Sequence, residues 1–64
     1  MFITRFTKDD GFIEDYYYHF KEDAIQHLDL FKTDNSGLYT SIVVINDSSN
    51  VIVKALIFKL GQNQ

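Results

Sequence analysis

Cysteine, proline and tryptophan are absent from the 64-residue chain, and glycine occurs only three times. Without cysteine, the chain can form neither a disulfide bond nor a thiolate metal site. Without proline, no strand or helix is interrupted by a residue that lacks a backbone N–H group. No apolar run reaches the roughly 18 residues that span a bilayer, so no membrane partner is expected. The opening residues MFITRFTKDD lack the apolar stretch of a signal peptide, which predicts a cytoplasmic location.

The charge balance also lacks the basic excess that marks many nucleic-acid-binding proteins. Six basic and nine acidic residues give a net charge of −3, which disfavours nucleic acid as a partner. A chain of this length forms one domain with a thin core. Its hydrophobic content of 45% compensates for the missing disulfides. We therefore expect a single small α+β domain over residues 1–60, followed by a polar C-terminal tail at 61–64.

Apolar periodicity predicts five secondary-structure elements. Alternating or β-branched segments predict strands at 2–8, 12–19, 38–46 and 51–60. Asp10-Gly11 between the first two segments is a strong hairpin signal. Ala24, Leu28 and Phe31 recur at helical spacing and predict a helix near residues 21–32, although no good N-cap residue precedes it.

The element order strand, strand, helix, strand, strand predicts a two-layer ββαββ fold. Its four-stranded, mostly antiparallel sheet carries one helix packed on one face. This order resembles the β-grasp plan of small immunoglobulin-binding bacterial domains, which implies strand order 2-1-4-3 with strands 1 and 4 parallel in the centre. The two-sided apolar pattern of 51–60 is consistent with such a central position. Other orders, including separate hairpins around the helix, stay open, and the resemblance implies no function.

One short helix covers only one face of such a sheet, so the opposite face is the best candidate site. Arg5, Asp15 and Lys54 should avoid the helix side, because an unpaired buried charge is costly. Apolar residues on the same strand faces would then form an exposed patch, which usually marks an interface. A one-residue bulge would move part of this set to the other face. The predicted interaction face consists of Tyr17, His19, Tyr39, Val43, Ile45, Ile52, Lys54, Leu56 and Phe58.

Signals for catalysis or for a cofactor are weak. His19 and His27 are the only histidines, and they stand in no recognised catalytic or metal-binding spacing. We therefore predict no enzymatic activity, no catalytic residues, no metal, no cofactor and no small-molecule substrate. A histidine on the strand surface and a histidine flanking the helix stripe are the simpler interpretations.

Two nucleic-acid hypotheses remain as alternatives. An open sheet with Tyr17, Tyr39, Arg5 and Lys54 could bind single-stranded nucleic acid by stacking. The carboxylates of the first hairpin could instead mimic nucleic acid, although a solvated surface explains them as well. The leading hypothesis is a non-enzymatic interaction protein that forms a homodimer or binds a protein partner through the open sheet face.

Overall fold

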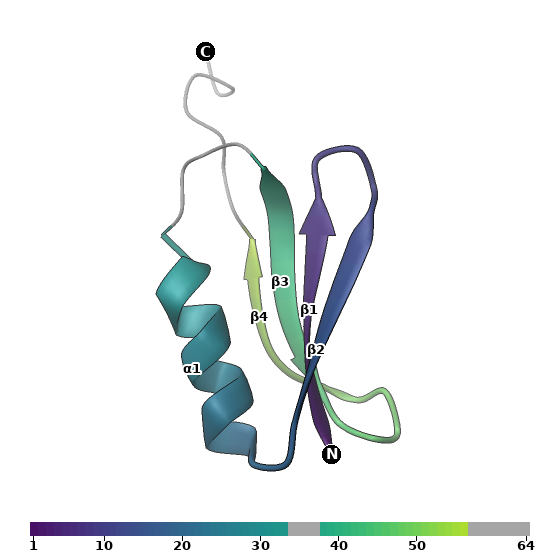
Figure 1. Cartoon of the computed structure of the whole chain (residues 1–64), viewed down its shortest axis with the longest axis vertical. Helices are drawn as coiled ribbons and strands as arrows, with labels where there is room; N and C mark the ends of the chain where they lie inside the picture. The colour runs from purple at the N-terminus through teal and green to yellow at the C-terminus, as the bar shows by residue number, and fades with distance from the viewer. Residues whose placement is uncertain (34–37, 57–64) are drawn as a thin grey trace.

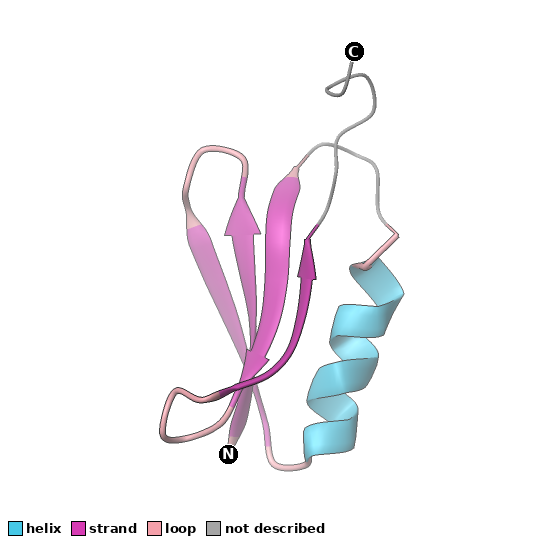
Figure 2. Ribbon diagram, turned by 180° about the vertical axis from the view of Figure 1, so that it is seen from behind, coloured by secondary structure: helices cyan, strands magenta, loops and turns pink. Residues whose placement is uncertain are grey.

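The computed structural model describes residues 1–33 and 38–56, and these form one four-stranded sheet with one helix. The elements are strands β1 (Phe2–Lys8) and β2 (Ile13–Tyr18), helix α1 (Lys21–Phe31), and strands β3 (Tyr39–Ile45) and β4 (Val51–Leu56). All neighbouring strands are antiparallel, and α1 lies along one side of the sheet (Figures 1 and 2). The predicted two-layer α+β fold is confirmed. Residues 57–60 of the predicted last strand lie outside the described residues.

The strand order is β2-β1-β3-β4, which differs from the order 2-1-4-3 implied by the β-grasp resemblance. After β2, the chain passes through α1 and returns on the far side of β1 as β3. Ile3 then lies opposite Ile45, and Phe6 lies opposite Ile42. Both orders contain the same two hairpins, so the element order alone could not separate them. The observed order replaces a parallel central pair with an antiparallel one, which is slightly more stable per residue.

Strand β4 is an edge strand, so its predicted central position is wrong. The helix packs on β1, β2 and β3, and Val51, Ile52 and Leu56 of β4 are exposed. Burial on both faces occurs instead on β3, an interior strand, where Ile42, Val44 and Ile45 are buried. Apolar residues on both faces make a strand suitable for burial. Whether the strand is buried depends on which strands the helix covers, and α1 packs on β1, β2 and β3.

The core lies between α1 and the central strands. Its fully buried members come from three elements: Phe6, Ala24, Leu28, Ile42 and Val44. Thr4 is the one buried polar residue among those described, and its Oγ1 donates a 2.9 Å hydrogen bond to the backbone oxygen of Ala24. That bond removes the cost of burying the hydroxyl and ties the middle of β1 to the first turns of the helix.

Helix α1 depends on this packing, because its ends are poorly stabilised. Phe20 occupies the N-cap position and makes no side-chain capping hydrogen bond, as the sequence predicted. Glu22 and Asp23 in the first turn interact favourably with the helix dipole. An isolated helix of 11 residues is marginal in water, so burial of Ala24 and Leu28 supplies most of its stability.

The first hairpin turns through a three-residue loop that ends in a left-handed glycine. The N–H of Lys8 donates to the oxygen of Phe12 at 2.7 Å, and the N–H of Gly11 donates to the oxygen of Lys8 at 2.9 Å. Gly11 has φ +89°, a conformation that costs other residues strain. The Asp10 carboxylate also accepts the Phe12 N–H at 2.9 Å. The predicted Asp10-Gly11 hairpin is confirmed.

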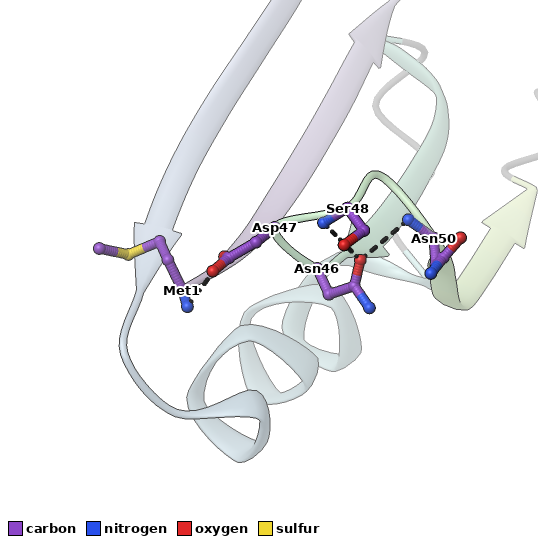
Figure 3. A network of polar contacts seen from close by, with 5 residues as sticks. All are labelled: Met1, Asn46, Asp47, Ser48 and Asn50. Atoms are coloured by element: carbon purple, nitrogen blue, oxygen red, sulfur yellow. Dashed lines mark hydrogen bonds and ion pairs between the residues drawn. The ribbon is translucent and has the colours of Figure 1, made fainter.

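The second hairpin repeats this loop without a glycine. The N–H of Asn46 donates to the oxygen of Asn50 at 3.1 Å, and the N–H of Ser49 donates to the oxygen of Asn46 at 2.9 Å. Ser49 takes the position of Gly11 and has φ +64°. The side-chain oxygen of Asn46 compensates by accepting the backbone N–H groups of Ser48 and Asn50 at 3.0 and 2.9 Å (Figure 3).

We predict that Ser49→Gly stabilises the protein by up to about 1 kcal/mol, because glycine adopts the left-handed region without steric cost. Ser48→Gly is the matched control and should destabilise slightly, because Ser48 lies outside that region. Gly11→Ala should cost about 1 kcal/mol through backbone strain alone, since nothing lies within 4 Å of the added Cβ. Urea denaturation followed by circular dichroism measures all three. A loss of stability in Ser49→Gly would contradict the shared loop geometry.

We predict that Leu28→Ala costs about 2–5 kcal/mol, which is enough to unfold most of the population of so small a domain. Leu28 is 1% exposed, whereas Leu30 on the same helix is 71% exposed. Leu30→Ala therefore carries the same change in helix propensity without the loss of core packing. Leu28→Ala should melt at a clearly lower temperature than Leu30→Ala. Equal melting temperatures would mean that Leu28 does not belong to the buried face of the helix.

Candidate functional site

The face of the sheet opposite α1 has an ion pair near its centre. Arg5 on β1 and Asp15 on β2 lie directly opposite each other in the strand register. The guanidinium Nε and Nη2 atoms donate to the two carboxylate oxygens of Asp15 at 2.8 and 2.9 Å. These hydrogen bonds hold the pKa of Asp15 below its usual range and raise the pKa of Arg5. Each charge is thereby neutralised within the face.

Apolar side chains surround this pair. In the register, Ile3 lies between Tyr17 and Ile45, and Arg5 lies between Asp15 and Val43. Ile45 is only 6% exposed although it stands apart from the core cluster beneath the helix, so this face already buries part of its own apolar surface. Tyr17, at 62% exposure, is the largest apolar group left open to a partner.

The register places five of the nine predicted face residues together on the open face. Residues that lie opposite each other in neighbouring strands share a face. The register therefore places on the same face as Ile3, Arg5 and Thr7 the residues Tyr17, Val43, Ile45, Lys54 and Leu56. His19 is exposed but follows the end of β2, in the connection to α1. Ile52 is the extra residue of an irregularity in β4, because Val51 rather than Ile52 lies opposite Ile45. Phe58 lies outside the described residues.

The assignment of Tyr39 to the open face is wrong. The β1–β3 register shifts by one residue after Thr7, so that Thr40 is extra and Tyr39 lies opposite Lys8. The shift moves the Tyr39 ring to the helix side, where it lies 5.1 Å from the Phe6 ring and 6.2 Å from the Phe31 ring, measured between centroids. A bulge moves every side chain beyond it to the opposite face of the sheet. No residue pattern in 38–41 predicts where the bulge lies.

A second polar feature lies at His27, which the sequence placed beside the helix stripe without a hydrogen-bond partner. The Tyr18 hydroxyl and His27 Nδ1 are hydrogen-bonded at 2.7 Å across the space between β2 and α1. Four other rings lie around the imidazole, with centroids 4.8–5.7 Å away: Phe6, Tyr16, Tyr18 and Phe31. Burial lowers the pKa of His27 below its usual value. The helical spacing predicted its place beside the stripe, but no sequence pattern paired it with Tyr18.

An open depression of about 390 Å³ lies beside this histidine, at the side of the helix that faces β2. Its lining combines aromatic, apolar and polar groups: Tyr18, Asp23, Gln26, His27, Leu30 and Phe31. Within residues 1–33 and 38–56, no three histidine or acidic side chains gather in a way that could hold a metal ion.

The residues of the two nucleic-acid hypotheses are not assembled as those hypotheses require. Of the proposed stacking residues, Tyr39 lies on the helix side, and Arg5 is engaged by Asp15. On the first hairpin, Glu14 forms a 3.0 Å ion pair with Lys8, so at least two of its carboxylates are neutralised internally. These observations give neither hypothesis support.

Comparisons with known proteins give no family assignment: no family model, curated protein or solved structure matches the chain significantly. In residues 1–33 and 38–56 no helix is long and apolar enough to cross a membrane. The cytoplasmic location stays a prediction.

We predict that His27 makes the protein less stable as the pH falls through the range in which histidine titrates. Because its pKa is lowered in the folded state, the unfolded chain binds the proton first. The stabilising contribution is therefore complete above the unfolded pKa of about 6.5 and is lost as the pH falls towards the folded pKa.

His27→Gln should flatten the dependence of unfolding free energy on pH between about 8 and 5, measured by urea denaturation. His19→Gln is the matched control, because it makes the same chemical change at an exposed position outside the helix. Equal slopes in wild type and His27→Gln would exclude this role for the imidazole.

Proposed function

We propose that this chain is a non-enzymatic interaction protein that associates with a second copy of itself through the open sheet face. One observation carries the proposal: apolar side chains remain exposed on the side of the sheet that α1 does not cover. Tyr17, Ile13 and Leu56 are 50–62% exposed there. They lie on the two edge strands of a face that also holds Ile3 and Val43, and an exposed apolar face is a candidate interaction site.

The charges of the face favour a copy of the same chain as the occupant. Arg5 and Asp15 neutralise each other, and Lys54 is the one other charged residue on the described part of the face. A partner of either sign finds little to match, whereas a nearly neutral apolar surface is complementary to itself. A twofold axis through such a face produces a closed dimer, the commonest oligomer of soluble proteins.

The size of the face sets the strength of association. Four strands about 4.8 Å apart and six residues long present a flat area of roughly 400 Å². Stable interfaces bury about 800 Å² on each partner. Ile45 is also already buried within the monomer, which reduces the apolar gain on binding. We therefore expect a weak dimer, with a dissociation constant of roughly tens of micromolar or above.

Two substitutions test the proposal without disturbing the core. Leu56 on β4 and Tyr17 on β2 are 60% and 62% exposed, so lysine at either position should be tolerated by the monomer. We predict that Leu56→Lys and Tyr17→Lys each weaken self-association at least tenfold, because each buries an unpaired ammonium group in an apolar interface. Sedimentation equilibrium from about 10 µM to 1 mM covers the relevant range.

Leu30→Lys is the control, because it makes the same chemical change on the exposed face of α1, where the side chain is 71% exposed. It should associate like the wild type. A wild type that stays monomeric at millimolar concentration, or face variants that associate as well as Leu30→Lys, would exclude this function.

A further inference from the structure

Strand β2 is an edge strand whose outer backbone groups can be assigned from the hairpin. In an antiparallel pair, every second residue forms backbone hydrogen bonds with the neighbouring strand. Because Lys8 N–H donates to the oxygen of Phe12, the residues of β2 that form backbone hydrogen bonds with β1 are Glu14, Tyr16 and Tyr18. The alternate residues Ile13, Asp15 and Tyr17 then direct their N–H and C=O groups away from the sheet. No other described strand pairs with this edge. An unpaired edge of this kind is a template for an added strand.

The depression beside His27 lies along the same side of the molecule. Tyr16 and Tyr18 of β2 contact the His27 ring, and Tyr18 lines the depression together with His27, so the depression adjoins β2. Side chains of an added strand alternate between the two faces of the sheet. Every second side chain of a strand added to β2 is therefore directed towards the helix side, where the depression lies.

The charge and lining of the depression indicate which side chain fits it. Asp23 lines it and Glu22 precedes it in the first turn of α1. Neither forms an ion pair within the described part of the chain, in contrast to the carboxylates of Glu14 and Asp15. Among the described lining residues there is no lysine or arginine. Aromatic and aliphatic side chains at Phe31 and Leu30 offer an apolar path for the alkyl chain of a lysine.

From these observations we propose that the groove between β2 and α1 binds an extended, lysine-containing peptide segment of another protein. The segment adds a strand to the β2 edge and places its ammonium group beside Asp23. This site uses a different surface from the open sheet face, so the proposal does not depend on self-association.

The probe is a blocked pentapeptide, acetyl-Thr-Val-Lys-Val-Thr-amide, titrated into ¹⁵N-labelled protein and followed by NMR. Strand addition predicts amide shift changes that are larger at Ile13, Asp15 and Tyr17 than at Glu14 and Tyr16, because only the first set faces the added strand. The His27 ring signals should shift in the same titration. Peptides with glutamate or norleucine in place of lysine test whether the positive charge is required, and both should bind more weakly.

Three protein variants test the added strand and the charge contact separately. Tyr17→Pro removes one outward N–H, which an edge strand tolerates, and it should abolish peptide binding, whereas Tyr17→Val keeps the N–H and should bind like wild type. Asp23→Asn should weaken the lysine peptide about two- to fivefold and leave the norleucine peptide unchanged. If Tyr17→Pro does not fold, the peptide series on the wild type and Asp23→Asn still decides the question.

Several outcomes would overturn the proposal. One is the absence of shift changes at several millimolar peptide. Another is a set of shift changes confined to the open-face residues of β3 and β4, such as Val43 and Lys54, and a third is equal binding of the lysine and glutamate peptides. Without peptide, concentration-dependent shifts at Ile13, Asp15 and Tyr17 with none at Val43 and Lys54 would instead assign this edge to a second copy of the chain.

Discussion

Phe6 is the side chain on which the two layers of this protein converge. It is 2% exposed at the middle of β1, and its ring contacts rings from every element that flanks that strand beneath the helix. Tyr16 reaches it from β2, His27 and Phe31 reach it from α1, and Tyr39 reaches it from β3. Edge-to-face and tilted geometries of this kind add to the stabilisation that comes from buried area. In a chain without disulfides, this aromatic cluster takes over much of the role of a covalent staple.

The surfaces available for function follow from this single centre. One helix held over β1, β2 and β3 leaves the far face of the sheet, the β2 edge and most of β4 exposed. On the far face Arg5 and Asp15 pair with each other, which leaves Lys54 as the one unpaired charge among the described residues there, while the β2 side is acidic because Asp23 stands without a cationic partner in the described region. Two chemically different surfaces therefore arise because the helix covers only part of the sheet.

Local features of the fold could be predicted from the sequence, and the long-range ones could not. Asp10-Gly11 and the Ala24-Leu28-Phe31 stripe act over a few residues, so their patterns located the first hairpin and the helix correctly. Strand order depends on how far one helix reaches. The helix packs on β1, β2 and β3, and β4 lies at the edge of the sheet despite its apolar residues.

The candidate site was predictable to the same extent. Alternation grouped Tyr17, Val43 and Lys54 correctly, because no bulge separates them from their partners around Arg5. It failed at Tyr39, where one extra residue reverses the face. The Tyr18–His27 hydrogen bond joins two elements whose relative position no local pattern encodes.

The pairing of β1 with β3 also determines how the chain reaches its native state. Ile3 and Ile45 lie opposite each other, so 41 residues separate them along the chain, whereas each hairpin closes over a three-residue loop. Closing the long segment costs more conformational entropy than forming either hairpin, and it gains little until Phe6 meets the helix and Tyr39. The docking of β3 is therefore the expected barrier to folding. Neither hairpin has a core of its own, so the domain should fold and unfold as one cooperative unit.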